Sequence, residues 1–536
     1  MKKKSHGQWS VVLMIFMVLF MFGSSTYGVE YKQNGEAIIS IDVDDTSKTN
    51  NLMSYAVDVE GNISGPEDFT IDNGNLYVLN SANNTVLKYI RGKVLQTIAL
   101  DDVGIKGIKI ASDNDNLYVL GNDYSIKKID SNGILSDIEH PNNSKYEAIT
   151  DFNVINDYLY VSTSEGDYGT TYKVDLCDTT RSGKKIDSFE GRVFDENTTY
   201  KVKLMPEVGK SLGHSCILTI SDINTGKKSI TLTSDYWVAG AQYLGITDNG
   251  DYTIKLFELA SKPDYTIAAE ETIRIISPEG DLKDVCVLDK QVKSIANQTK
   301  TFSNEIYHLN NLNNVVQIVR ISIPEENSAE GYHSVFDNTA EPKSQLPIND
   351  SSITAIKRST IMANARSFHS SFTWTCTDAN LAALTNWTKP RYVGSAGTYS
   401  YMPYCWGGFS SISQYNSGMS TGGRVGNINT STSGHVANTY GLDCSGYVSR
   451  CWGLTTHHGT GQFANISTVI DISNILEGDA LNNHPSHIVL FEEFDSSGNF
   501  ILYESTKLNS YDRVSHTIRS ASSMSNYTPI RYNNVN

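Results

Sequence analysis

Short stretches in which apolar and polar residues alternate recur through the N-terminal part of the chain. The tetrapeptides NLYV at 75–78, NLYV at 116–119 and YLYV at 158–161 begin 41 and 42 residues apart, each after a turn rich in Asn, Asp or Gly. A second alternating segment follows each of them, at 85–89, 125–129 and 170–174. Alternation with a period of two residues, bounded by turn residues, predicts short β-strands joined by tight turns.

The constant spacing of these strand pairs indicates an internal repeat. Weaker copies of the pattern occur at 250–254 and 305–309. A repeat of about 40 residues is typical of a four-stranded propeller blade, which cannot bury its faces alone and must stack beside other blades. We therefore expect an all-β propeller of about six or seven blades over residues 29–325. A solenoid is the alternative, and a pair of β-sandwiches agrees less well with the constant period.

The N-terminus has the pattern of an export signal. Lys2, Lys3 and Lys4 precede an unbroken apolar run at 11–22, and small residues follow. This arrangement predicts a signal peptide at 1–28 and a mature protein that is secreted or held at the cell surface or cell wall. If the apolar run is not cleaved, it would instead act as a membrane anchor.

The length and composition change the picture in two ways. A chain of 536 residues is longer than one hydrophobic core usually supports, so at least two domains are expected. A formal net charge of −16 argues against a protein that binds nucleic acid by bulk electrostatics.

Residues 326–350 are rich in Pro, Glu, Asn, Asp and Ser, which predicts a linker. Helical spacing of apolar residues at 353–368 then marks the start of a second domain, 351–536.

The cysteines provide the first candidate for chemistry. Their number is odd, so in an exported protein at least one is unpaired within the chain. The seven are Cys177, Cys216, Cys286, Cys376, Cys405, Cys444 and Cys451. An unpaired cysteine in such a protein is a candidate nucleophile.

Four motifs follow one another in the second domain: YCWGG at 404–408, GLDCSGYV at 441–448, EGD at 477–479 and SHIVLF at 486–491. In this order they resemble the NlpC/P60 family of papain-like cysteine peptidases. The resemblance covers about residues 351–536. It implies an α+β papain-like fold and a bacterial enzyme that cleaves amide bonds in the stem peptides of peptidoglycan, during remodelling or lysis of the cell wall.

Cys444 is the expected nucleophile. Asp443 has the chemistry of a helix N-cap, so Cys444 would lie in the first turn of a helix, where backbone N–H groups stabilise a thiolate and an oxyanion. The alternative is a buried core cysteine, and we assign that role to Cys451. The resemblance gives Tyr404 a role in positioning substrate or stabilising the oxyanion, with Asp443 beside it.

His487 is the expected general base because it opens an apolar strand, where its ring would be well fixed. His484 is the nearby alternative, but it lies in a loop. Glu504, on the next predicted strand, would orient His487. The family more often has a second histidine at this place, so Glu504 departs from its pattern. Four other histidines are expected to be loop residues without a catalytic partner: His435, His457, His458 and His516.

These assignments predict a Cys-His-Glu hydrolase that needs no metal and no organic cofactor. Its substrate would be peptidoglycan or another cell-wall peptide, and the propeller would bind a wall component or a protein. Two alternatives remain: an amidase or acyltransferase on the same fold, and a surface-binding propeller with a catalytically silent C-terminal domain. Residues 409–442 separate the first two motifs by more than the family usually has. We expect a loop that acts as a lid or specificity element, and the alternative is an insertion without a role of its own.

Overall fold

The structure is a computed structural model. It describes residues 35–42, 53–58, 61, 63–102, 104–131, 133, 135–138, 148–177, 187–288, 299–312, 315–322, 336 and 355–536. The predicted signal peptide 1–28 lies outside the described residues, as does the predicted linker 326–350 except for Phe336. Asn34–Asn536 forms one compact unit. Among the helices that the structure describes, none is long and apolar enough to cross a membrane.

The predicted repeats form three four-stranded antiparallel sheets. The tetrapeptides of the repeat lie in β5, β9 and β13, and the segments that follow them lie in β6, β10 and β14. The strands of the three sheets, in order, are β4 Pro66–Asp72, β5 Asn75–Asn80, β6 Thr85–Ile90 and β7 Lys93–Ala99; β8 Gly107–Asp113, β9 Asn116–Gly121, β10 Ile126–Ile129 and β11 Leu135–Ile138; β12 Ile149–Ile155, β13 Tyr158–Thr163, β14 Thr170–Asp175 and β15 Asp187–Glu190. Each prediction of a strand pair is confirmed.

A seven-stranded sheet follows, and it contains two repeats that share a strand. Its strands are β16 Arg192–Val193, β17 Thr198–Leu204, β18 Gly213–Asp222, β19 Gly226–Ile246, β20 Tyr252–Ser261, β21 Ile267–Ile276 and β22 Leu282–Val287. The 21-residue strand β19 pairs with β18 up to Val238 and with β20 from Trp237 onward. One long strand thus serves as the last strand of one four-stranded unit and the first of the next.

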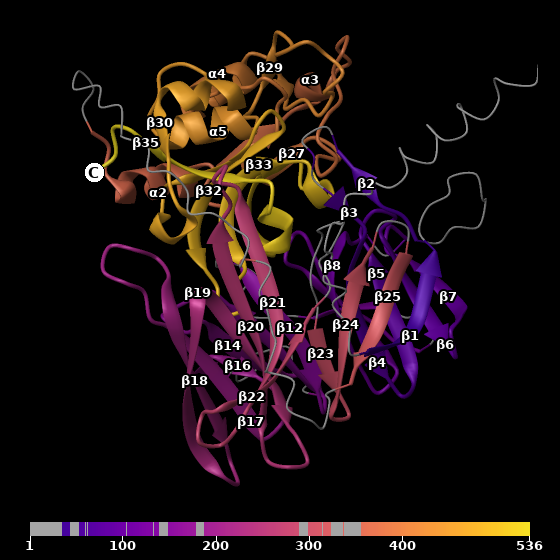
Figure 1. The fold of residues 1–536 in the computed structure, drawn as a ribbon. Helices are drawn as coiled ribbons and strands as arrows, with labels where there is room; N and C mark the ends of the chain where they lie inside the picture. Colours follow the sequence, from indigo (N-terminus) through magenta and orange to yellow (C-terminus); the bar gives the residue numbers. More distant parts are fainter. Residues whose placement is uncertain are drawn as a thin grey trace, which may run out of the picture. The chain divides into compact units, whose positions relative to one another are not determined.

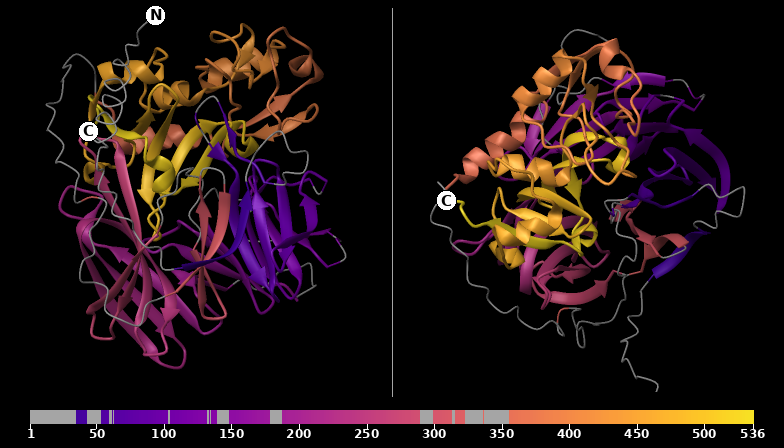
Figure 2. Two further views of the ribbon diagram at one scale, coloured as in Figure 1. Left: turned by 45° about the vertical axis from the view of Figure 1, so that its right-hand side comes forward. Right: turned by 90° about the horizontal axis from the view of Figure 1, so that it is seen from above.

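The ring of sheets is closed by the two ends of the repeat region. Strand β1, Gly35–Asp42, pairs antiparallel with β25, Val315–Ile321, beside β24 Glu305–Asn311 and β23 Thr299–Phe302. Packing of β24 on β4 and of β23 on β19 completes a cycle of neighbouring sheets (Figures 1 and 2). Because closure leaves few unpaired sheet edges, it stabilises a propeller. With β19 counted in both of its units, the described residues contain six propeller-like repeats.

The C-terminal part is also rich in β-structure. A six-stranded sheet has the order β30-β35-β31-β32-β33-β34, and α5 packs against β32 and β33 (Figure 1). The sheet strands are β30 Ser467–Val469, β31 Ala480–Asn483, β32 His487–Phe494, β33 Phe500–Thr506, β34 Arg513–Arg519 and β35 Thr528–Tyr532. The α-helices are α2 Arg358–Ser367, α3 Asp378–Leu381, α4 Ile412–Ser420 and α5 Cys444–Cys451. The helix expected at 353–368 therefore begins five residues later than predicted.

Short elements complete the described part of the chain. The short strands are β2 Ala56–Val57, β3 Ile63–Ser64, β26 Thr373–Cys376, β27 Gly397–Ser400, β28 Arg424–Val425 and β29 Thr439–Tyr440. The 3-10 helices are η2 Thr460–Asn465, η3 Ile472–Asn474, η4 Leu508–Ser510 and η5 Ser522–Met524.

The six-stranded sheet contributes to two hydrophobic clusters. In the first, Ile488 and Tyr503 pack with residues of α2 and α5. In the second, other residues of the same sheet pack with the seven-stranded sheet of the propeller region. The buried members of that second cluster include Leu212, Ala239, Leu259, Ile267, Leu481, Val489, Phe491, Phe500 and Leu502. The two parts of the chain therefore share a core, which explains why they form one compact unit.

Polar contacts fix the position of the sheet against the propeller. Arg192 forms a buried ion pair with Asp495, with an Nη2–Oδ2 distance of 3.1 Å. The backbone of Gly240 approaches the turn at 496–498 so closely that an added Cβ would lie 2.2 Å from the backbone nitrogen of Gly498. Only glycine fits at this point of contact.

We predict that Gly240→Ala destabilises the protein, because the new methyl group must displace backbone from both parts of the chain. Overpacking of this kind costs about 1–3 kcal/mol. The matched control is Gly394→Ala, since nothing lies within 4 Å of an added Cβ there. Thermal unfolding of the two variants and the parent measures the difference, and equal melting temperatures for both variants would contradict the close approach.

Candidate active site

Cys444 is the first residue of α5. Asp443 caps this helix, as predicted: its Oδ1 accepts hydrogen bonds from the backbone N–H of Gly446 at 2.6 Å and from the hydroxyl of Ser445 at 2.9 Å. The absence of a side chain at Gly446 lets the carbonyl oxygen of Gly408 approach the helix, where a Cβ would lie 2.1 Å from it. Local structure therefore explains both of the last two residues of the DCSG sequence, Ser445 and Gly446.

Cys444 is buried, like Cys405 and Cys451, but differs from them in lying in the first turn of a helix. The first turn of a helix directs backbone N–H groups and a positive partial charge toward a side chain located there, which favours a thiolate. Burial instead raises the pKa of the Cys405 thiol to about 12 and raises that of Cys451 as well. Cys451 is fully buried in the core beside Trp452, in agreement with its predicted packing role.

His487 and Glu504 form a hydrogen-bonded pair on the adjacent strands β32 and β33. The Nε2–Oε2 distance is 2.7 Å, and both side chains are fully buried. A carboxylate can only accept, so Nε2 of His487 donates to it, and Nδ1 is the ring nitrogen outside this hydrogen bond. His484, the alternative base, is exposed in the preceding loop.

Two further residues hold Glu504. Arg519 donates from Nε to Oε1 at 3.0 Å and from Nη2 to Oε2 at 2.5 Å, and the Thr517 hydroxyl donates to Oε1 at 2.5 Å. Burial alone raises the pKa of Glu504, but the charge of Arg519 and the hydrogen bond from His487 bring it well below the usual range. Glu504 therefore remains ionised. Neither residue was predicted from the sequence. The signal that could have found them is the alternation of polar residues along β34, which includes Thr517 and Arg519.

The helix of Cys444 lies against the strands of this pair. Helix α5 packs on β32 and β33, and Cys444 belongs to the same buried cluster as Ile488 and Tyr503, the sequence neighbours of His487 and Glu504. The Ser505 hydroxyl of β33 also donates to the carbonyl of Leu442 at 2.7 Å, two residues before Cys444.

Tyr404 lies beside the segment that leads to the helix. Its backbone forms a parallel bridge with Leu442, and its N–H donates to the carbonyl of Asp512 at 2.8 Å. The side chain is fully buried. Tyr404 is thus buried beside the segment that leads into α5, and its predicted role toward substrate or oxyanion stays a prediction.

Two histidines expected to lie in loops without partners prove to have them. His457 is 2.9 Å from the Ser445 hydroxyl and 3.3 Å from Asp443, and its ring stacks on Phe409. His516 lies in β34, stacked on Tyr503 and 2.6 Å from Glu492. His457 does lie in a loop, as expected, but His516 lies in a strand, and the expectation that the two have no partner was wrong. That expectation considered only residues nearby in sequence, whereas Ser445, Phe409, Glu492 and Tyr503 come from other parts of the chain.

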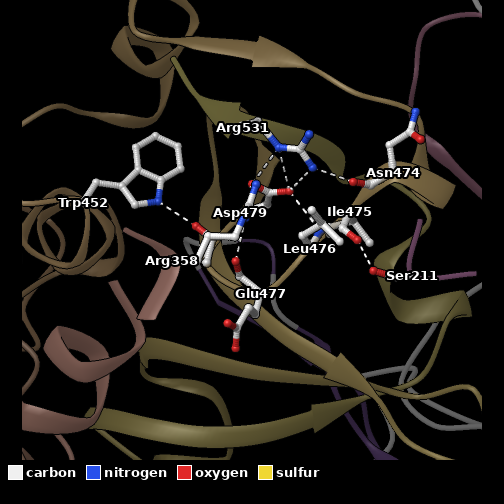
Figure 3. A network of polar contacts seen from close by, with 10 residues as sticks. Ser211, Arg358, Trp452, Asn474, Ile475, Leu476, Glu477, Asp479 and Arg531 are labelled. Atoms are coloured by element: carbon white, nitrogen blue, oxygen red, sulfur yellow. Dashed lines mark hydrogen bonds and ion pairs between the residues drawn. The ribbon is translucent and has the colours of Figure 1, made fainter. Parts of the chain in front are cut away.

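The Gly478-Asp479 motif is a structural junction (Figure 3). Asp479 accepts from Arg358 at 2.9 Å and from Arg531 at 2.7 Å, and so joins the start of α2 to β35. The Trp452 indole, directly after α5, donates to the carbonyl of Gly478 at 2.9 Å. This network joins the start of α2, the end of α5 and β35.

Residues 409–442, expected to be a loop, are a loop only in part: 428–438 contain no helix or strand. The other residues of the segment fold into the core. They contain α4, β28 and β29, and Tyr415, Met419 and Val425 pack in the same cluster as Cys444. The ring of Tyr440 occupies the space where a Cβ on Gly418 would lie, 2.3 Å away. The glycine content of the segment thus reflects close packing rather than a mobile lid.

Comparisons with known proteins identify no family. No family model matches the chain, and no curated protein matches it. The WD40 β-propeller domain of Doa1 is 14% identical over 55% of this chain and 95% of that chain, with a TM-score of 0.29. Virginiamycin B lyase from Staphylococcus aureus is 10% identical over 48% and 96%, with a TM-score of 0.29. BamB from Moraxella catarrhalis is 12% identical over 53% and 99%, with a TM-score of 0.26. These similarities are too low to indicate a function. The propeller-like arrangement is seen in the order of the strands in the sheets.

We predict that Asp479→Ala lowers stability, because it removes the shared anion of two partly buried arginines. Breaking a buried ion pair by removing one partner costs on the order of 3 kcal/mol. Glu477→Ala is the control, since Glu477 is an exposed carboxylate two residues away. Denaturant unfolding followed by tryptophan fluorescence measures both; a loss no larger for Asp479 than for Glu477 would contradict the junction.

The His457–Asp443 contact predicts a pH-dependent stability. Burial lowers the pKa of His457, but the hydrogen bond and charge of Asp443 outweigh it, so the net shift is upward. A raised folded pKa gives stabilisation that is fully present below the unfolded pKa of about 6.5 and is lost as pH rises through the folded value. His457→Gln should therefore lower the melting temperature more at pH 5.5 than at pH 9. In an Asp443→Asn background this pH dependence should vanish; its persistence would contradict the pairing.

Proposed function

We propose that residues 355–536 form a papain-like domain of the NlpC/P60 type and that the protein is a cysteine hydrolase of peptidoglycan stem peptides. The observation that carries the proposal is the buried hydrogen bond between His487 and Glu504, on strands against which the helix of Cys444 packs. Burying a charged side chain costs free energy unless a partner of opposite charge is buried beside it. Such pairs are found at sites where a perturbed proton affinity is used.

The chemistry follows from the groups present. The Cys444 thiolate attacks the amide carbonyl, and the N–H groups of the first turn of α5 stabilise the oxyanion. The C–N bond breaks as His487, protonated at Nδ1, gives its proton to the departing amine. A thioester remains on Cys444. His487 then takes a proton from water, whose hydroxide attacks the thioester and releases the carboxylic acid and the Cys444 thiolate, with His487 again protonated.

Glu504 holds His487 in one orientation and one tautomer through Nε2. The anion also stabilises the imidazolium that forms when the thiol gives up its proton. Arg519 and Thr517 fix the carboxylate from its other side, so Glu504 cannot rotate away from the ring. A carboxylate thus takes the place where the family more often has a second histidine.

The substrate assignment is supported by the order of the four motifs and by the export signal expected at residues 1–28. A secreted or surface-held hydrolase meets the cell wall, where stem peptides supply amide bonds. The propeller would hold the enzyme near a wall component or a protein. An amidase or acyltransferase would use the same residues but leave different products, and a silent domain would leave none.

We predict that the full chain releases stem-peptide fragments from purified peptidoglycan and that Cys444→Ala releases none. Loss of the nucleophile should lower the rate by a factor on the order of 10⁵. Glu504→Gln should lower it by a factor on the order of 10² or more, because the ring loses its anionic partner. Mass spectrometry of the soluble fragments measures the rate and names the bond cleaved.

The matched control is Cys177→Ala, which removes an exposed thiol far along the sequence from the site. It should leave the rate unchanged. Equal activity of Cys444→Ala and the parent would contradict the assignment of the nucleophile. Absence of fragments from every variant, including the parent, would contradict the substrate class, and transfer products in place of hydrolysis products would assign the acyltransferase alternative.

A further inference from the structure

A cavity of about 670 Å³ lies between the inner strands of the propeller-like repeats and the C-terminal part of the chain. All six repeats contribute to its wall, through β4, β8, β12, β16, β19 and β23. Residues 497–527 complete the wall from the other side, including Ser497, Asn526 and Tyr527. The cavity is separate from the Cys444 helix, which contributes no residue to the lining.

The wall contains five lysine and arginine side chains: Lys109, Arg192, Lys262, Lys300 and Arg519. Each of three wall cations has an ion-pair partner at hydrogen-bond distance. These pairs are Lys300–Asp68 at 2.7 Å, Arg192–Asp495 at 3.1 Å and Arg519–Glu504 at 2.5 Å. Lys109 interacts electrostatically with the buried acid Glu67, and Lys262 donates to the carbonyl oxygen of Ser525 at 3.2 Å. Because three of the five wall cations are paired with carboxylates, we expect the wall to attract an anion only weakly and to favour an uncharged ligand.

Hydroxyl groups of the wall remain available for a ligand. Ser497 is 6% exposed, and among the described residues its Oγ has no hydrogen-bond partner. Thr150 is 5% exposed and also lines the cavity. A buried hydroxyl left without a partner is destabilising, so such groups in proteins generally bond to water or to a ligand. Aromatic rings of Phe302 and Tyr527 lie in the same wall.

We propose that this cavity binds a small, uncharged, hydroxyl-rich ligand of the size of a mono- or disaccharide. Ser497 and Thr150 would exchange hydrogen bonds with its hydroxyl groups, and the aromatic rings would contact its apolar face. The volume lies within the range of about 300–1,000 Å³ that is usual for small-molecule sites. The proposal does not depend on the hydrolase chemistry, because binding is measured without turnover.

The test is calorimetric titration of the full chain with maltose and with N-acetylglucosamine, and separately with citrate and inorganic phosphate. We expect at least one of the two sugars to bind and neither anion to do so. Ser497→Ala and Thr150→Val should each weaken sugar binding on the order of fivefold, the loss of one hydrogen bond. The melting temperature of unliganded Ser497→Ala should not fall, because the hydroxyl it removes has no partner.

Ser417→Ala is the control, since Ser417 is exposed on α4 outside the cavity. It should leave sugar binding unchanged. The proposal is overturned if neither sugar binds, if an anion binds more tightly than both sugars, or if sugar binding is unaffected in both Ser497→Ala and Thr150→Val. Two cavity variants are used so that the test stands if one of them fails to fold.

Discussion

The six-stranded sheet of the C-terminal part is buried against neighbours on two sides, and the rest of the structure depends on this constraint. Helices α2 and α5 pack in one hydrophobic cluster with the sheet, and the propeller-like repeats pack in another. A sheet covered in this way excludes water from its side chains. Polar groups on its strands must therefore find partners inside the protein. His487, Glu504, Thr517 and Arg519 satisfy one another under that constraint.

Within this group, one buried anion is shared by two potential cations. Arg519 compensates the charge of Glu504 whatever the protonation state of His487, so the carboxylate does not need the imidazolium in order to remain ionised. His487 can then lose its proton without leaving Glu504 as an unpaired buried anion. This is the property that a general acid and base requires. These side chains keep their positions only if the strands that carry them are rigid. The core that the sheet shares with the propeller-like repeats provides this rigidity.

Much of this organisation is visible in the sequence, because it depends on local signals. The repeats follow from alternation and turn residues, and the start of α5 follows from the N-cap residue Asp443. The shared strand β19 was not predicted, since two strands fused into one have no turn between them. Arg519 was missed because only strand pairing brings it to Glu504. The folding of 409–442 was missed because the packing of Tyr440 on Gly418 joins residues far apart in the sequence.

The central claim is that the His487–Glu504 pair lies at a reactive Cys444, and the pH dependence of thiol alkylation tests it most directly. The full chain is treated with iodoacetamide from pH 4 to 10, and the labelled Cys444 peptide is quantified by mass spectrometry. The account predicts that Cys444 reacts with an apparent pKa well below the value of about 8.5 for a free cysteine, and that His487→Ala moves it upward. An ordinary or raised value in the parent, unchanged in His487→Ala, would contradict the account.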